Sequence, residues 1–174
     1  MDGQLVEVRI PKSVQTIEEN AFYGCGKLEK VVIARGSKLA EIKSGAFQGC
    51  DSLRLALVPK NVKSIADDAF PEPTKVVKVL SIPAKMTRQL AEQVLIDENG
   101  KKVLLIPEGV QELGDGCFRD MSIHEVRVPE SVTSIAENAF EACRDLRQIT
   151  FAAASQAKLL GSGVFKLFPN LKIV

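Results

Sequence analysis

Hydrophobic and polar positions along the chain follow a pattern that returns every 22–25 residues. The phrase VRIPKSVQTIEENAFYGC at 8–25 comes back as VRVPESVTSIAENAFEAC at 126–143, and weaker copies lie between them. One slot of the pattern holds an aromatic residue, at Phe22, Phe47, Phe70, Phe118, Phe140 and Phe165. The successive intervals are 25, 23, 48, 22 and 25 residues, so the longest one spans two periods. A fixed period of this length predicts a tandem-repeat protein.

Each repeat opens with a phrase of the form L-x-x-V-x-I, which predicts a short strand with alternate residues pointing inward. Five copies are complete, and they are Leu5/Val8/Ile10, Leu28/Val31/Ile33, Leu53/Ala56/Val58, Ile123/Val126/Val128 and Leu146/Ile149/Phe151. Two copies fit less well, at Val77/Leu80/Ile82 and Lys101/Leu104/Ile106, and the residues from Leu171 to Val174 open one more. Proline follows most of these phrases, and it ends a strand because it has no N–H for the ladder. The chain is therefore expected to contain eight such strands.

The second part of each repeat has two apolar residues three apart, then a polar gap and an Ala-Phe pair. In the first repeat these residues are Val14, Ile17 and Phe22. The sequences TIEENAF and SIAENAF predict a single helical turn, with Thr16 or Ser134 as N-cap.

A unit of 22–25 residues cannot bury its own apolar side chains, so neighbouring units must stack. A strand, a turn and a helical turn at this period predict a right-handed leucine-rich-repeat solenoid of the α/β class. It should have a single curved parallel β-sheet, with short helical or irregular turns on the convex side. We expect one domain over 1–174 with about seven repeats.

The signature I-P-x-S-V-x-x-I-x-x-x-A-F-x-x-C-x-x-L resembles the BspA-type leucine-rich repeat, which is common in surface proteins of bacteria and parasitic protists. The resemblance covers residues 5–174 and weakens across 71–102. It implies a non-enzymatic protein-binding module that attaches a cell surface to host proteins, matrix proteins or other cells. The sequence itself leaves the compartment unknown, since the chain shows no signal peptide.

The segment 71–102 is degenerate or inserted, and two interpretations fit it. Asn99-Gly100 between two apolar runs predicts a β-hairpin. Met86, Leu90 and Val94 share helical spacing, so 85–93 is a short helix in this first interpretation, which resembles the hairpin interruptions of BspA-type arrays. In the second interpretation the segment is an ordinary coil that has lost its signature.

The composition of the chain excludes several classes of function. With 45 % hydrophobic residues and a formal net charge of +1, the chain is a folded protein without an electrostatic case for nucleic acid. No apolar run approaches the ~18 residues needed to span a bilayer, so membrane insertion is not expected. The chain has one His, one Tyr and no Trp, which leaves little material for catalysis. We expect no enzyme activity, no cofactor and no catalytic or metal site.

Four cysteines occur, and their repeat slots indicate packing. Cys25, Cys50 and Cys143 share the slot three residues after the phenylalanine, while Cys117 takes a slot that elsewhere holds alanine. Their spacing matches no zinc pattern. Buried free thiols are expected, although Cys25 and Cys50 lie in adjacent coils, so a disulfide between them remains open.

The residues between the inward-facing ones on each strand form two columns on the concave sheet, apolar in the middle and charged or polar at the ends. Such a patch is a candidate binding site for a protein ligand of unknown identity. Its members are Lys30, Val32, Leu55, Leu57, Val79, Val103, Leu105, Glu125 and Arg127. Two alternatives stay open: the insert or a further domain covers the patch, or the chain is a structural spacer or an intracellular scaffold.

The ends of the chain carry a further expectation. The sequence opens on a strand phrase without a preceding cap and closes one strand into a new repeat. Solenoids normally finish in capping elements, because uncapped ends expose strand edges and core side chains. The chain is therefore expected to be a fragment of a longer array or to associate end to end with another copy.

Overall fold

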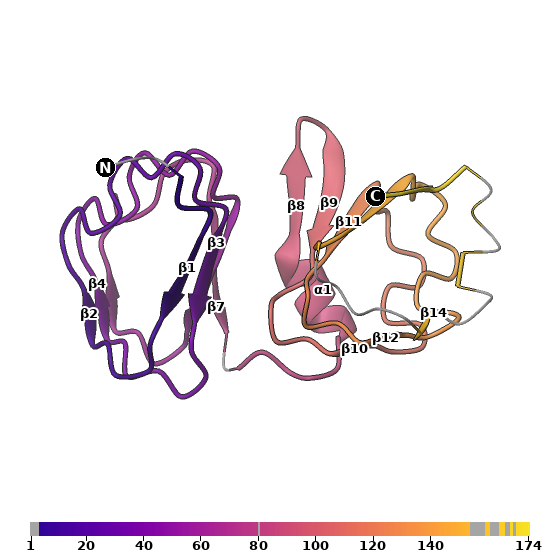
Figure 1. Ribbon diagram of the computed structural model, residues 1–174, viewed down its shortest axis with the longest axis horizontal. Helices are drawn as coiled ribbons and strands as arrows, with labels where there is room; N and C mark the ends of the chain where they lie inside the picture. Colours follow the sequence, from indigo (N-terminus) through magenta and orange to yellow (C-terminus); the bar gives the residue numbers. More distant parts are fainter. Residues whose placement is uncertain (1–3, 80, 154–158, 161–163, 166–167, 169) are drawn as a thin grey trace. The chain divides into compact units, whose positions relative to one another are not determined.

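The computed structural model is mostly β, with one α-helix among the residues that it describes. The chain divides into two compact units, unit 1 (Met1–Ser81) and unit 2 (Ile82–Val174) (Figure 1). The described residues are 4–79, 81–153, 159–160, 164–165, 168 and 170–174.

The strand phrases of unit 1 form the expected parallel strands. They are β1 (Glu7–Ile10), β3 (Lys30–Ile33), β5 (Leu55–Pro59) and β7 (Lys75–Val79). β1 pairs with β3 and β5 pairs with β7, both in parallel. β3 lies next to β5, but the described residues form no ladder between them. The predicted single sheet is thus two pairs of strands in this unit.

The opposite side of unit 1 differs from the prediction. A second parallel ladder runs there through three two-residue strands, β2 (Thr16–Ile17), β4 (Glu41–Ile42) and β6 (Ser64–Ile65). Thr16 pairs with Glu41 in this ladder, so its predicted role as a helix N-cap is wrong. Each two-residue strand forms only by pairing with the neighbouring coil. The sequence of a single repeat does not contain this second strand, so it cannot indicate the ladder.

Unit 2 repeats both ladders. Its larger sheet contains four parallel strands, β9 (Lys101–Leu105), β11 (Glu125–Val128), β13 (Gln148–Phe151) and β15 (Lys172–Ile173). Its second ladder contains β10 (Glu112–Leu113), β12 (Ser134–Ile135) and β14 (Leu159–Leu160). Ser134 pairs with Glu112 in β10 and is not an N-cap either.

The first part of unit 2 forms a helix and a hairpin, as the first interpretation of the degenerate segment expects. Helix α1 (Arg88–Val94) begins after Thr87, whose hydroxyl accepts a hydrogen bond from the Leu90 amide at 3.2 Å. Strand β8 (Leu95–Glu98) then turns back antiparallel onto β9. Asn99 and Gly100 have φ of 55° and 80°. A two-residue hairpin turn of type I′ needs positive φ at both of these positions.

Helix α1 replaces the phenylalanine turn of its coil. The residues just before it still join the second ladder, because the Met86 amide donates to the Glu112 carbonyl at 2.8 Å and Lys85 forms a parallel bridge with Glu112. The predicted fourth strand is displaced at the same point. It was placed on Val77, Leu80 and Ile82, but β7 ends at Val79, and Leu80 lies outside the described residues.

The cores confirm the repeat alignment. Inward residues of the strand phrases, such as Leu28 and Leu53 in unit 1 and Ile123 in unit 2, are fully buried. The described phenylalanine rings contact one another from coil to coil within each unit, and they are stacked except for the tilted pair Phe140–Phe165. The ring centroids are 5.1 Å apart for Phe22–Phe47, 4.8 Å for Phe47–Phe70, 5.0 Å for Phe118–Phe140 and 6.2 Å for Phe140–Phe165.

Candidate functional site

The nine predicted patch residues divide between the two units. Unit 1 contributes Lys30, Val32, Leu55, Leu57 and Val79, and unit 2 contributes Val103, Leu105, Glu125 and Arg127. We call the side of the strands that points away from the core the outer sheet face. Burial alternates along β5, where Ala56 and Val58 are buried while Leu55 and Leu57 are only half-buried. The outer sheet face of unit 1 therefore includes these two leucines.

The strand register corrects one member of the patch. The phrase Val77/Leu80/Ile82 aligns Val79 with Leu55 of the preceding repeat, but Val79 pairs with Pro59 at the end of the strand. Lys75 lies opposite Leu55, and Val77 lies opposite Leu57. The run KVVKVL at 75–80 can be aligned with the strand phrase in two registers. A change of register moves every side chain of the strand to a different position along the sheet. The apolar part of this face is thus formed by β5 and by Val77.

The charged part of the same face lies on β1 and β3. The Arg9 Nε is 2.7 Å from one carboxylate oxygen of Glu7, and the Lys30 Nζ is 4.0 Å from the other. Glu7 and Arg9 are two residues apart on one strand, so they share a face. Unit 1 thus presents half-exposed leucines next to a set of paired charges.

Unit 2 places its four patch residues differently. The side chain of Val103 is only 1 % exposed, so it does not reach the surface. Leu105 is half-buried and lies opposite Arg127 in the ladder. Strand β8 of the hairpin extends this sheet at its edge, since it pairs with β9.

Arg127 holds the hairpin to the central strand of unit 2. Its Nη1 and Nη2 are 3.1 and 2.8 Å from the two carboxylate oxygens of Glu98, and its Nε is 2.8 Å from Glu125. Burial lowers the pKa of Arg127, but the hydrogen bonds to Glu98 and Glu125 outweigh this, so its pKa is raised. Glu125 and Arg127 repeat the arrangement of Glu7 and Arg9, and here the insert adds a third partner.

The cysteine slot has a function that the sequence did not indicate. The Cys50 thiol donates to the Phe22 carbonyl at 3.2 Å, and the Cys143 thiol donates to the Phe118 carbonyl at 2.9 Å. Each bond joins one coil to the phenylalanine of the preceding coil. The sequence does show that both cysteines follow the phenylalanine of their own repeat by three residues. It does not show the hydrogen bond, because the acceptor carbonyl belongs to the preceding coil.

All four thiols are free, and three of them are buried. Burial raises the pKa of Cys50 and of Cys143 to about 11 and that of Cys117 to about 12. A thiol with such a pKa is protonated at neutral pH and therefore a poor nucleophile or metal ligand. Cys25 is half-buried and forms no disulfide with Cys50.

His124 contributes to the fold of unit 2. Its Nδ1 accepts a hydrogen bond from the Lys102 amide at 3.0 Å, which links two neighbouring coils. Among the described residues, no group of three or more His, Cys, Asp and Glu side chains is arranged to hold a metal ion. No helix in the described part of the chain has the length and apolar character to cross a membrane.

Unit 2 also has a surface cavity of about 390 Å³ beside the Cys143 turn. Its lining includes Arg144, Arg147 and Asn170. The guanidinium of Arg147 is already engaged, because it donates to the carbonyls of Arg144 and Leu146 at 2.8 and 3.1 Å. These bonds hold the Arg147 side chain against the turn through its Nη1.

Comparison with known proteins gives one family match. The model of the BspA-type leucine-rich-repeat region matches residues 2–94 and 97–174, in six copies. None of the curated proteins matches the chain.

The solved structures similar to this chain include leucine-rich-repeat proteins of bacteria. The pneumococcal vaccine antigen PcpA is 20 % identical at a TM-score of 0.39, with 84 % of this chain and 39 % of that one covered. A leucine-rich cell-surface protein of Faecalibacterium prausnitzii is 19 % identical at a TM-score of 0.38, with 90 % and 62 % covered. A leucine-rich-repeat protein of Bacteroides ovatus is 19 % identical at a TM-score of 0.30, with 84 % and 55 % covered. The chain thus spans less than two thirds of the length of each of these three.

Proposed function

Because this chain belongs to the BspA-type leucine-rich-repeat family, whose members are generally protein-interaction modules, we propose that it is a non-enzymatic protein-binding module. The proposed setting is a cell surface, and the proposed partners are host or matrix proteins. Binding takes place on the outer sheet face.

The observation that carries the proposal is the composition of this face in unit 1. Leu55, Leu57 and Val77 form its apolar part, on two paired strands. Glu7, Arg9 and Lys30 provide charges on the first two strands of the same unit. Apolar contact area beside a polar rim is typical of surfaces that bind proteins. The fold does not need leucine at these positions, since Glu7 and Arg9 occupy equivalent slots in the first coil.

The chemistry of the described residues supports a binding role over catalysis. Three thiols are buried with raised pKa, and the ring of His124 accepts a backbone hydrogen bond. Nucleophilic catalysis needs an accessible, activated nucleophile beside a base. Binding needs only the surface.

The test measures binding of the full chain to a panel of immobilised, purified extracellular-matrix proteins on a biosensor. Leu57→Glu tests the face of unit 1, and Leu105→Glu tests that of unit 2. A charge at the centre of an apolar contact is expected to weaken binding by tenfold or more, which is about 1.4 kcal/mol or above. Tyr23→Glu is the matched control, because Tyr23 is 65 % exposed on a turn outside the strands.

Equal binding by the chain and both leucine variants would overturn the assignment of the site. Failure to bind any member of the panel would favour a structural spacer, in which neither leucine matters. Circular dichroism and thermal unfolding of each variant separate a lost contact from a lost fold.

A further inference from the structure

A row of unpaired positive charges follows one edge of unit 1. In each coil, a loop leads from the large strand to the two-residue strand, over 11–15, 34–40 and 60–63. These loops carry five basic residues and no acidic one. All five are exposed, and they are Lys12, Arg35, Lys38, Lys60 and Lys63. We call this set the basic edge.

Backbone hydrogen bonds place the three loops side by side. The Lys38 amide donates to the Lys12 carbonyl at 2.9 Å, and the Lys63 amide donates to the Ala40 carbonyl at 2.8 Å. The Asn61 side chain adds a bond to the Leu39 carbonyl at 2.9 Å. Adjacent strands are about 4.8 Å apart, so the charges follow one another at short steps along unit 1.

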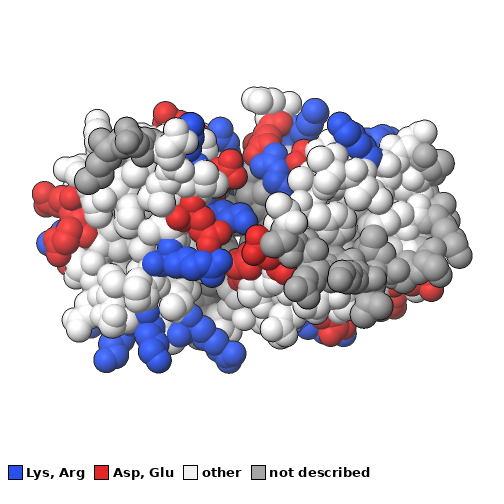
Figure 2. Space-filling view, viewed as in Figure 1, with Lys and Arg blue, Asp and Glu red and all other residues white. Residues whose placement is uncertain are grey.

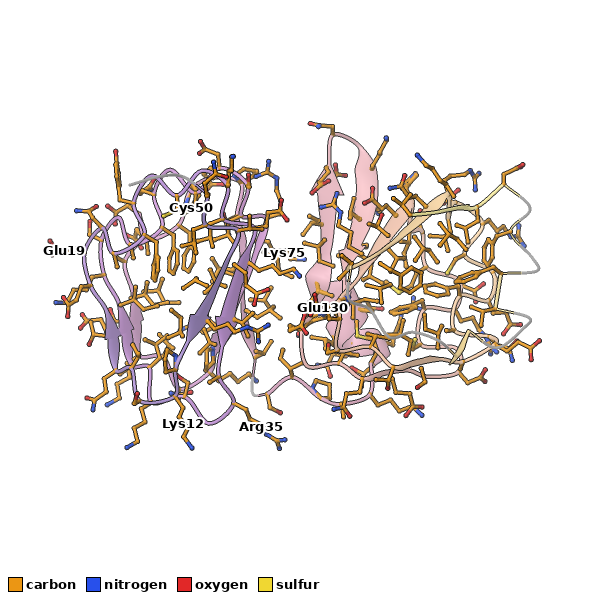
Figure 3. The ribbon with its side chains drawn as sticks, in the orientation of Figure 1. Lys12, Glu19, Arg35, Cys50, Lys75 and Glu130 are labelled. Atoms are coloured by element: carbon orange, nitrogen blue, oxygen red, sulfur yellow. The ribbon has the colours of Figure 1, made fainter. Side chains whose placement is uncertain are left out.

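The charges gather visibly on this edge. Figure 2 shows basic side chains along the lower margin of unit 1 with no acidic side chain among them. Lys12 and Arg35 both point away from the ribbon there (Figure 3).

The basic edge is not neutralised within the fold. Among the described residues, none of its five side chains forms an ion pair, whereas Lys30 and Lys43 elsewhere in unit 1 pair with Glu7 and Glu18. Five like charges in adjacent loops repel one another, which destabilises the folded chain slightly. The stability of the fold therefore does not explain why these five basic residues are present.

The repeat itself shows that the loops do not need positive charge. In unit 2 the slot of Lys12 is occupied by Glu130 and the slot of Lys60 by Glu108, directly after the same proline. The following strands keep their ladder in both units. The basic residues of unit 1 are thus a property of its surface rather than of the coil.

We propose that the basic edge binds a linear polyanion, and that the ligand is a sulfated polysaccharide of the glycosaminoglycan class. A row of Lys and Arg at short, repeated steps matches a flexible chain that carries anionic groups along its length, and Arg35 can bind a sulfate through two parallel hydrogen bonds. Only long-range charge and hydrogen bonding are required, so an apolar pocket is not needed.

Other anionic partners fit the same loops less well. The three loops contain no aromatic residue on which nucleic-acid bases could stack. Their larger apolar residues, Val14, Leu39 and Val62, are buried or half-buried, so none is free to insert into a lipid bilayer.

The experiment uses the full chain and a size-defined heparin oligosaccharide, measured by titration calorimetry at about 50 and 200 mM NaCl. Binding is expected at low salt, with a clear loss of affinity at the higher salt concentration. Lys12→Glu/Lys60→Glu is expected to weaken binding by about tenfold or more, because it removes two contacts and adds repulsion. These substitutions introduce the residues that unit 2 already has in the same slots.

The matched control is Lys27→Glu/Lys101→Glu, which changes the net charge equally at two exposed lysines outside the basic edge. It should retain most of the affinity. Lys12→Gln/Lys60→Gln provides a neutral second variant should the glutamates impair folding, and it should weaken binding to a smaller degree.

Absence of binding at low salt, or equal losses in the basic-edge and control variants, would overturn the proposal. Tighter binding to single-stranded DNA of equal charge, or to vesicles containing phosphatidylserine, would overturn the choice of a polysaccharide. The result is independent of the proposed protein-binding face, since Leu57→Glu should leave heparin binding unchanged.

Discussion

Gly45 shows, at the scale of single residues, how closely two coils approach. It has a φ of +63°, and a Cβ there would lie 2.3 Å from the side-chain oxygen of Asn20 in the coil before it. Gly36 has a similar φ of +72°, but a Cβ there would have no neighbour within 4 Å. A substitution at Gly36 therefore measures the strain of positive φ alone, while one at Gly45 measures this strain and the steric clash with Asn20.

We predict that Gly45→Ala destabilises the chain more than Gly36→Ala does. Gly36→Ala should cost about 1 kcal/mol, because alanine is strained at positive φ. Gly45→Ala should cost this amount and the displacement of Asn20, in total roughly 2–3 kcal/mol. Urea unfolding of both variants provides the measurement, and equal losses would contradict the contact with Asn20.

The buried thiols lead to a prediction about alkaline pH. Burial raises the pKa of Cys50 and of Cys143 to about 11, from 9.0 for a thiol exposed to water. The unfolded thiols lose their protons as the pH passes 9, while the folded ones keep theirs. The contribution of these thiols to the free energy of unfolding is therefore fully present below pH 9. It falls as the pH rises toward 11, by on the order of 1 kcal/mol per pH unit for each thiol.

The check compares urea unfolding of the parent chain and of Cys50→Ala/Cys143→Ala between pH 8 and about 11. Lysine and tyrosine titrate in both proteins, so the difference between the two slopes isolates the thiols. The variant should lose stability less steeply with pH. Parallel slopes would show that these thiols do not titrate differently on unfolding.

At the scale of elements, the phenylalanine turns act as a column. Phe47 is fully buried and stacks on a ring on either side, whereas Phe22 is half-buried and stacks on one described ring. The energy that each ring contributes should follow its number of neighbours.

We predict that Phe47→Ala destabilises the chain by about 3–5 kcal/mol and that Phe22→Ala costs clearly less. Phe47→Ala leaves a cavity between two rings, while the Phe22 site can collapse toward solvent. Chemical unfolding of both variants tests the order. A larger loss for Phe22→Ala would show that the column does not behave as a stack of neighbours.

The elements also show which parts of the fold could be predicted from the sequence. The strand phrases were recognisable because each repeat contains its own alternation of inward and outward residues, as on β5 and β11. The two-residue strands were not, because Thr16-Ile17 is too short to have a period of its own. It pairs only with a residue 25 positions further along, Glu41 in the case of Thr16.

The candidate site was predictable to the same degree. Leu55 and Leu57 follow from alternation within a complete phrase, and Leu105 follows from the same alternation in the less regular phrase Lys101/Leu104/Ile106. Val79 was misplaced because β7 has valines at three of its five positions, so two frames satisfy the pattern. The burial of Val103 and the bond between Arg127 and Glu98 both involve the hairpin region, which no other repeat resembles.

At the scale of the whole molecule, stability should be local. Each unit has its own ladders and its own contacts between phenylalanine rings. In repeat proteins, a change in one coil is felt mainly by its neighbours.

We predict that Phe47→Ala lowers hydrogen-exchange protection in unit 1 and leaves β11 and β13 of unit 2 nearly unchanged. Phe118→Ala is the reciprocal variant and should affect unit 2 alone. Hydrogen exchange followed by mass spectrometry resolves the two units. Loss of protection throughout the chain in either variant would mean that the chain unfolds as one cooperative body.

The register of the second ladder has a consequence for how such a chain can change in length. Ile17 pairs with Ile42, so the two residues occupy equivalent positions in successive coils. A deletion of residues 18–42 would join Ile17 to Lys43, and Lys43 would follow an isoleucine of the same slot as before. The shortened chain would keep the repeat register, and β2, which pairs with β4, would take β6 as its new neighbour. Recombination between the corresponding stretches of a gene would then add or remove one complete coil, so a protein of this kind can grow or shrink in steps of a whole repeat with the register of the ladder kept.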